Sequence, residues 1–146
     1  MNGQTKALFD VSVLADALMN DSLPMLESSE ALTLAADGQV EGYLCAAAVE
    51  FLNDMLTRAH GHPSARAKII ALRNMLAVAP VDSAVIDAAM ALGWHYLDDA
   101  MTHECARVNG LDAVVTLNPS DFAAATLPIL APRDLLKQLK GQGPRH

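Results

Sequence analysis

The feature that most constrains this 146-residue chain is a repeated alternation between short apolar runs and longer segments with helical periodicity. The short runs predict β-strands, and the segments between them predict helices. A chain that alternates in this way favours a mostly parallel sheet covered by helices on both faces. We therefore predict one three-layer α/β/α domain, built on a mostly parallel central sheet of about five strands.

The expected strands are short, and two of them are informative about position in the sheet. They cover residues 7–9, 42–45, 78–81, 112–116 and 127–130. The 112–116 run is almost entirely apolar or β-branched, which is typical of a central strand. Pro80 interrupts the 78–81 run and predicts a sheet edge or a strand end there.

Helical periodicity and capping residues predict the elements between the strands. The expected helices cover residues 11–20, 28–37, 47–60, 64–76, a segment from 82 or 83, 98–109 and a segment from 132. Ser64 is expected to cap one of them, and Asp82 or Ser83 another. In the helix from 82 or 83, the apolar side chains of Val85, Ile86, Ala89 and Met90 are expected to face inward. Residues 141–146 predict a disordered tail, which leaves a domain of residues 1–140.

Composition restricts the function. The formal net charge is −7 and aromatic residues make up 4% of the chain. Both argue against a protein that binds nucleic acid by phosphate neutralisation or base stacking alone, unless a metal ion or a basic partner offsets the charge. Cys45 and Cys105 are expected to be buried thiols. Neither a secretory signal nor an apolar run of membrane-spanning length is evident, so we expect a soluble protein of the reducing cytoplasm, without a membrane partner.

Acidic residues recur at points that a parallel sheet would bring to one edge. They are Asp10 after the first strand, Glu50 early in the helix after the second, Asp98 and Asp99 at the start of the helix before the 112–116 strand, and Asp121 shortly after that strand. Ligands of such sheets bind beyond the carboxyl ends of the strands. Clustered carboxylates repel one another unless a cation lies among them, and hard oxygen ligands suit Mg²⁺ or Mn²⁺. Helix capping is the competing interpretation for all of them except Asp10, which ends a buried strand.

Four stretches of the chain together carry a family resemblance. They are residues 8–14 with Asp10, residues 47–52 with Glu50, Asp99-Ala100 followed by Ala106 and Gly110, and residues 115–122 with Thr116, Asn118, Asp121 and Phe122. In order and spacing they resemble the PIN-domain family, in particular the VapC-like toxin ribonucleases of VapBC-type toxin–antitoxin modules. The 115–122 motif is the most specific of the four, and the resemblance extends from about Ala7 to Leu139.

The resemblance implies a divalent-metal-dependent endoribonuclease that hydrolyses RNA phosphodiester bonds, the toxin of a type II toxin–antitoxin module. It implies that Asp10, Asp99 and Asp121 hold Mg²⁺ or Mn²⁺ and that Glu50 is a further ligand or orients water. It also implies supporting roles for Ser12 and Thr116, which would position water or a carboxylate, and for Asn118, which would orient Asp121 or contact substrate. Asp98 stays an alternative to Asp99 as the third acid, although the family spacing to Thr116 favours Asp99. His103 follows Asp99 by one turn, but an oxygen-preferring metal argues against it as a ligand.

The resemblance further implies a homodimer and a small antitoxin whose basic residues would neutralise the acidic pocket. Two features weaken the case for efficient RNA cleavage: the charge of −7, and Leu117 at a position where many relatives have arginine. A degenerate PIN domain acting as a protein- or RNA-binding module is therefore the main alternative. A phosphoacceptor receiver domain is a weaker one, because it would need a lysine near the pocket, whereas Lys137 and Lys140 lie in the last expected helix.

Overall fold

The computed structural model describes residues 4–20 and 26–141. Its centre is a parallel five-stranded sheet in the order β3-β2-β1-β4-β5. The strands are β1 (Lys6–Phe9), β2 (Glu41–Cys45), β3 (Ala77–Ala79), β4 (Ala113–Val115) and β5 (Ile129–Leu130). The predicted sheet is confirmed, with β3 at an edge as the proline after it indicated. The middle strand is β1, and β4 lies beside it.

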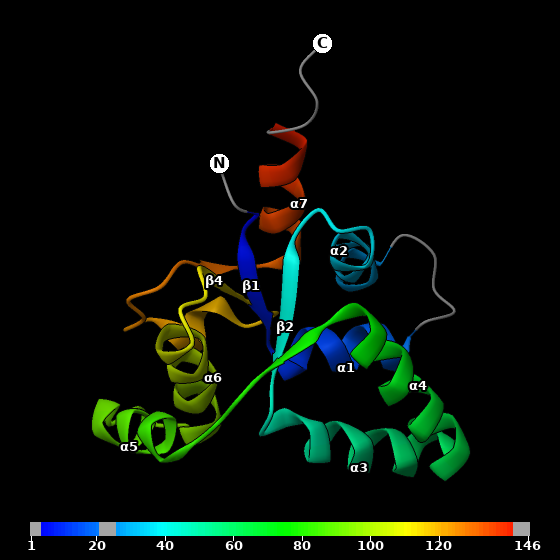
Figure 1. Ribbon diagram of the computed structural model, residues 1–146, viewed down its shortest axis with the longest axis horizontal. Helices are drawn as coiled ribbons and strands as arrows, with labels where there is room; N and C mark the ends of the chain where they lie inside the picture. Colours follow the sequence, from blue (N-terminus) through cyan, green and yellow to red (C-terminus); the bar gives the residue numbers. More distant parts are fainter. Residues whose placement is uncertain (1–3, 21–25, 142–146) are drawn as a thin grey trace.

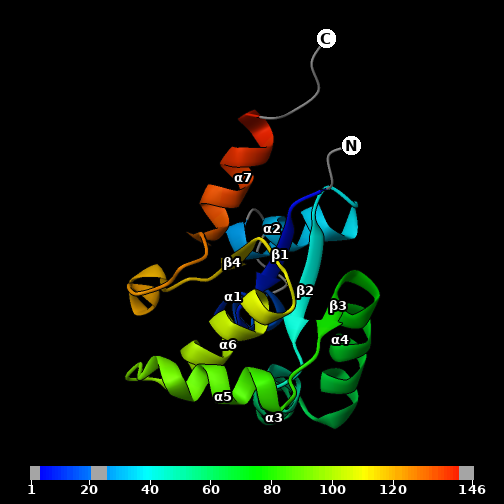
Figure 2. The same cartoon turned by 60° about the vertical axis from the view of Figure 1, so that its left-hand side comes forward.

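Helices cover both faces of this sheet (Figure 1). They are α1 (Val11–Met19), α2 (Glu27–Ala36), α3 (Ala48–His60), α4 (His62–Met75), α5 (Ser83–Leu92), α6 (Leu97–Val108), α7 (Pro132–Gly141) and the short 3₁₀ helix η1 (Pro119–Phe122). Helices α5 and α6 lie on one side of the sheet, and α1 to α4 lie on the other, which the turned view also shows (Figure 2). The three-layer α/β/α architecture is thus confirmed.

Two apolar cores follow from this layering, because successive side chains of a strand point to opposite faces. Phe9 and Val115 enter the larger core, whereas their neighbours Leu8 and Val114 enter the smaller one. Each helix of the larger core contributes a buried leucine: Leu14, Leu32, Leu52, Leu72 and Leu135. Burial of each such side chain stabilises the fold by about 1.5–3 kcal/mol before chain entropy is counted. The smaller core takes Val85, Cys105 and Phe122 from α5, α6 and η1.

Of the helix caps predicted from the sequence, one is confirmed and one is wrong. The Asp82 side chain caps α5 by accepting a hydrogen bond from the Val85 N–H at 3.2 Å, as expected. The predicted cap at Ser64 is wrong, since α4 begins at His62 after Gly61. Pro63 fits the first turn of a helix, because its missing N–H would have no partner there anyway.

The inward face predicted for α5 is half wrong. Val85 and Ala89 are buried, but Ile86 is 44% and Met90 62% exposed. Helix α5 packs against α6, and the narrow contact between two helices buries one i, i+4 stripe rather than two. The stripe of Ile86 and Met90 is left on the surface.

Three further expectations concern the thiols, the membrane and the tail. Cys45 and Cys105 are both buried and unpaired, as predicted. No helix within the described residues has the length and apolar character needed to cross a membrane. Gly141 ends α7, and the rest of the predicted disordered tail, residues 142–146, lies outside the described residues.

Candidate functional site

The strand order creates a natural site at the carboxyl ends of β1 and β4. The chain runs from β1 through β2 to β3 on one side of the sheet and places β4 and β5 on the other. Such a switch in direction opens a crevice between the two strands at that end of the sheet. Phe9 pairs with Val115 in this register. The residues that follow them, Asp10 and Thr116, therefore leave the sheet side by side.

Asp10 is held in place by hydrogen bonds to one of its two carboxylate oxygens. Oδ2 accepts from Ser12 Oγ at 2.7 Å and from Thr116 Oγ1 at 2.9 Å. Ser12 Oγ also accepts from the Leu117 N–H at 3.0 Å, which closes the network across the two strand ends. Asp10 is 5% exposed and Thr116 fully buried. No hydrogen bond from the described part of the chain reaches Oδ1, so this oxygen is available to a ligand.

Asp99 shares the electrostatic environment of Asp10. It lies half-buried in the first turn of α6. Its burial, together with the negative charges of Asp98, Asp10 and Asp121, raises the pKa of the Asp99 carboxyl to about 6. Asp98 is exposed, and its Oδ1 accepts a hydrogen bond from the Asp99 N–H at 3.0 Å. The fold thus brings Asp10, Asp98, Asp99 and Asp121 to one edge, with Asp99 as the more buried member of the doublet.

The turn after β4 links Asp121 to the same network. Asn118 donates its backbone N–H to Thr116 Oγ1 at 3.1 Å, and its carbonyl accepts from the Asp121 N–H at 3.0 Å. The backbone of Asn118 therefore connects Thr116 to Asp121. Asp121 itself is exposed in η1.

Glu50 lies on a different helix from these aspartates. It is exposed in the first turn of α3 and lines a hollow that also includes Asp54 and His62. It is not among the charges that raise the pKa of Asp99.

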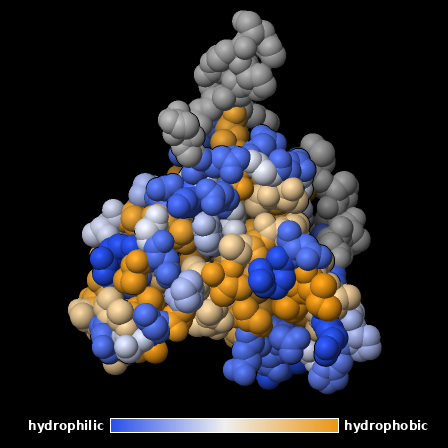
Figure 3. Space-filling model, viewed as in Figure 1, coloured by the Kyte–Doolittle hydropathy of each residue, from blue (hydrophilic) through white to orange (hydrophobic). Residues whose placement is uncertain are grey.

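A cavity that the sequence did not indicate adjoins the acidic edge. It measures about 340 Å³ and is lined mainly by apolar side chains: Val11, Cys45, Ala47, Ala48, Phe51, Leu97, Asp98, Met101 and Thr102. Apolar surface also shows among hydrophilic residues on the lower half of the molecule in Figure 3. At Cys45, a hydrogen bond with Cys105 lowers the pKa of the thiol to about 7, although burial opposes this.

The donor chemistry of the acidic edge fits a divalent cation. Mg²⁺ and Mn²⁺ prefer carboxylate oxygens, which Asp10, Asp99 and Asp121 supply. Burial is the main cause of the raised pKa of Asp99, and the negative charges of Asp98, Asp10 and Asp121 add to it; a cation among these carboxylates would offset that repulsion. Within the described residues, no three acidic, histidine or cysteine side chains are already arranged to hold an ion.

Comparison with known proteins assigns the family. The family model described as PIN domain matches residues 6–120. The chain therefore belongs to the PIN-domain family. A comparison with curated proteins finds no match.

Solved structures show which PIN proteins share the fold. DNA-bound VapBC from Salmonella typhimurium has a TM-score of 0.71 at 15% identity and covers 88% of this chain and 99% of its own. VapBC2 from Rickettsia felis, bound to a promoter DNA fragment, has a TM-score of 0.69 at 12% identity and covers 87% and 98%. VapC20 from Mycobacterium tuberculosis, a toxin that cleaves the sarcin–ricin loop, has a TM-score of 0.62 at 22% identity and covers 81% and 94%. These likenesses establish the fold.

Proposed function

We propose that this chain is a divalent-metal-dependent endoribonuclease that hydrolyses RNA phosphodiester bonds. The observation that supports this most strongly is the buried Asp10, fixed through Oδ2 by Ser12 and Thr116. A carboxylate that is pre-oriented at a strand end, with Asp99 and Asp121 in electrostatic reach, is suited to binding a cation. Membership of the PIN-domain family supports the same activity.

In this proposal, Asp10, Asp99 and Asp121 hold Mg²⁺ or Mn²⁺, and Glu50 is a further ligand or orients water. A bound metal ion lowers the pKa of a water ligand and stabilises charge on the phosphate. Ser12 and Thr116 keep Asp10 in one orientation, which leaves Oδ1 for the ion. Asp98 adds negative charge beside Asp99 and so increases the attraction for a cation.

The proposed partners follow from the toxin–antitoxin relatives and from charge. We propose that the chain is the toxin of a type II module in the cytoplasm, that it forms a homodimer, and that a small antitoxin blocks it. The support is the shared fold with the VapBC proteins and the net charge of −7, which favours a basic partner segment at the acidic edge.

A second candidate function is a protein- or RNA-binding module with little nuclease activity. Two observations favour it. Leu117 is 43% exposed beside Ser12 and offers no positive charge to a phosphate. The chain has 10 basic residues against 17 acidic ones, which is a poor balance for holding RNA without a metal ion.

A cleavage assay separates the two functions. Purified protein is incubated with structured RNA in Mg²⁺ or Mn²⁺, alongside Asp10→Asn and the surface control Asp87→Asn. If the chain is an endoribonuclease, the unmodified protein and Asp87→Asn cleave the RNA in the presence of the metal ion, and a chelator abolishes this cleavage. Asp10→Asn does not cleave. If the unmodified protein is as inactive as Asp10→Asn, the nuclease proposal fails and the binding module stands.

A further inference from the structure

His103 is a buried polar residue that the proposed metal chemistry does not use. It lies on α6, one turn after Asp99, and is 1% exposed. A buried imidazole needs partners for both ring nitrogens, because a polar group without a partner in the interior costs free energy. Its partners connect α6 to the segment that carries Asp121.

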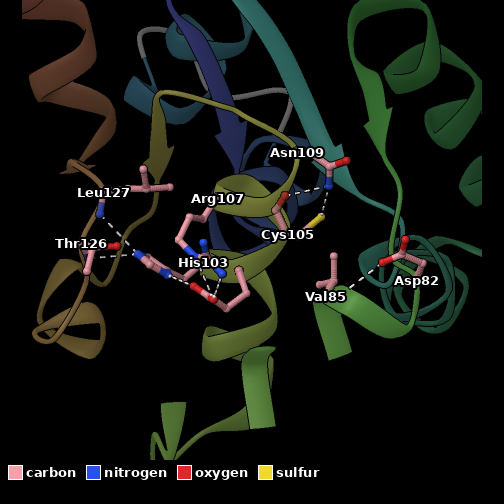
Figure 4. A network of polar contacts seen from close by, with 9 residues as sticks. Asp82, Val85, His103, Cys105, Arg107, Asn109, Thr126 and Leu127 are labelled. Carbon is pink, nitrogen blue, oxygen red and sulfur yellow. Dashed lines mark hydrogen bonds and ion pairs between the residues drawn. The ribbon is translucent and has the colours of Figure 1, made fainter. Parts of the chain in front are cut away.

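The hydrogen bonds of His103 determine its tautomer. Nε2 lies 3.1 Å from the Thr126 N–H and 3.3 Å from the Leu127 N–H (Figure 4). A backbone N–H can only donate, so Nε2 must be the unprotonated acceptor. The ring proton is therefore on Nδ1, which donates to Glu104 Oε2 at 2.7 Å.

Glu104 and Arg107 hold that tautomer in place. Arg107 donates through Nε at 2.9 Å and Nη2 at 2.8 Å to the other oxygen of Glu104. Burial opposes ionisation of Glu104, but the hydrogen bonds from Arg107 and His103 outweigh it and lower the pKa of the carboxyl. A carboxylate that stays ionised keeps the Nδ1 proton facing it, and so keeps Nε2 free to accept.

The segment held by Nε2 is the one that carries Asp121. It runs from the end of β4 through η1 to β5, and α6 contacts η1. Trp94 packs against the rings of both His103, at 5.2 Å between centroids, and Phe122, at 5.9 Å. The segment is therefore attached to α6 and its surroundings at two points that both follow the exposed Asp121 in the chain: the ring of Phe122, directly after it, and the two amides of Thr126 and Leu127.

We propose that His103 is a positioning residue of the metal site: its Nε2 holds residues 118–127 against α6, and this keeps Asp121 beside Asp99. His103 touches neither the metal nor the substrate. This inference rests on the proposed function, because it assigns His103 an effect on metal binding. The competing role is that of a core histidine that only stabilises the fold.

Two substitutions of His103 each keep one of its hydrogen-bonding functions and remove the other. In His103→Asn, the amide nitrogen replaces Nδ1 and can still donate to Glu104, but nothing accepts from Thr126 and Leu127. In His103→Gln, the amide oxygen can replace Nε2 as the acceptor, and the donor to Glu104 is lost. Ser28→Ala is the matched control, because it removes a buried hydrogen bond to Asp16 on the other face of the sheet.

The readouts are Mn²⁺ affinity by calorimetric titration and amide hydrogen exchange by NMR, at a temperature where circular dichroism shows every variant folded. We expect His103→Asn to bind Mn²⁺ about 10-fold more weakly, the scale of effect seen when groups that orient metal ligands are changed. Amide hydrogen exchange at residues 126 and 127 should be faster in His103→Asn than in the unmodified protein. His103→Gln should retain most of both properties, and Ser28→Ala should lower the melting temperature without changing Mn²⁺ affinity.

Two results would overturn the proposal, and they are distinguishable. If the unmodified protein binds Mn²⁺ and His103→Asn binds it equally well, His103 only stabilises the fold while the proposed function survives. If the unmodified protein binds no Mn²⁺, the proposed function fails and the role of His103 fails with it.

A measurement on the unmodified protein covers the case in which His103→Asn does not fold. Coupling between two sites is reciprocal, so Mn²⁺ bound through Asp121 must slow amide exchange at Thr126 and Leu127. Slower exchange at these two amides, with no change in α2, supports the proposal. Unchanged exchange at saturating Mn²⁺ contradicts it.

Discussion

At the scale of single residues, the site depends on how firmly one carboxylate is oriented. Asp10 receives two short side-chain hydrogen bonds on the same oxygen, from Ser12 and Thr116. Bonds to a charged group contribute more than bonds between neutral groups, and a buried charge that loses a partner is costly. The network therefore serves stability and orientation together.

Thr116→Val tests this network, because it removes the hydroxyl and keeps the β-branched shape. We expect a loss of about 1–3 kcal/mol in the free energy of unfolding, since a buried carboxylate loses a donor. Urea unfolding measures it. Thr33→Val, at an exposed threonine of α2, is the control and should change stability by less than about 0.5 kcal/mol. Equal losses in the two variants would show that Thr116 adds nothing specific.

Asp99→Asn tests the burial and charge repulsion that together raise the pKa of Asp99. The unfolded carboxyl loses its proton near its ordinary pKa of 3.8, but the folded one keeps it up to about 6. The folded state thus binds more protons in this window, so stability falls as pH rises through it. Asp99 is partly exposed, so solvent screening reduces the free energy that corresponds to its raised pKa. We therefore expect the uncharged Asp99→Asn variant to gain about 1 kcal/mol in the free energy of unfolding at pH 7.

Chemical unfolding of metal-free protein at pH 4 and pH 7 measures that gain. Asp99→Asn should be more stable than the unmodified protein at pH 7 and nearly equal to it at pH 4. Asp87→Asn, on the exposed side of α5, makes the same change in net charge and should show little effect. A loss of stability at pH 7 in Asp99→Asn would contradict the raised pKa of Asp99 in the folded protein.

Some of the residue-scale arrangement was predictable. Asp10 follows one apolar strand run and Thr116 ends another, and neighbouring parallel strands place their ends together. The order of burial within the Asp98-Asp99 doublet was not predictable, because both residues flank the apolar stripe of their helix. Only the way α6 lies on the sheet makes Asp99 the more buried. The hydrogen bonds of His103 to residues 126 and 127 likewise depend on a loop path that no periodicity encodes.

At the scale of elements, β2 packs tightly against α2 and the end of α4 at Gly42. A Cβ built on Gly42 would lie 2.5 Å from Leu76 Cδ2 and 2.8 Å from the Ala35 Cβ. Glycine at this position lets the helix layer approach the sheet. We expect Gly42→Ala to destabilise the fold by about 1–3 kcal/mol, the usual cost of overpacking.

A double-mutant cycle with Leu76→Ala checks the cause. If contact with Leu76 is the main cause, Gly42→Ala lowers the free energy of unfolding clearly less when residue 76 is already alanine. Part of the loss should remain, because the contact with Ala35 is still present. The same cost in both backgrounds would mean that the overpacking explanation is wrong. Thermal and urea unfolding of the four proteins provide the comparison.

Element types were readable from the sequence, but their packing partners were not. The alternation of apolar runs and helical segments predicted the parallel sheet and both helix layers. It did not predict that α5 packs on α6, and for that reason Ile86 and Met90 were expected in the core and lie on the surface. Periodicity identifies which residues are apolar on a helix, whereas tertiary packing selects the stripe that is buried.

At the scale of the whole molecule, the net charge of −7 opposes the RNA binding proposed above. Leu117 is exposed next to the Asp10 network. We expect Leu117→Arg to strengthen RNA binding and to steepen its salt dependence by about 0.7 in log Kd per log salt, the effect of one further phosphate contact on a single strand. Titration of labelled RNA at several salt concentrations measures this. Leu117→Gln should leave the slope unchanged, and an unchanged slope in Leu117→Arg would place RNA elsewhere on the molecule.

The claim that Asp10, Asp99 and Asp121 bind a divalent ion is the one on which the rest depends. Its most direct test is the melting temperature of the protein as a function of Mn²⁺ concentration, because a ligand that binds only the folded state stabilises it by mass action. The unmodified protein and Asp87→Asn should melt at progressively higher temperature as Mn²⁺ increases, and Asp10→Asn should not. A melting temperature that stays constant for the unmodified protein, or rises equally in Asp10→Asn, would contradict a metal site at the carboxyl ends of β1 and β4.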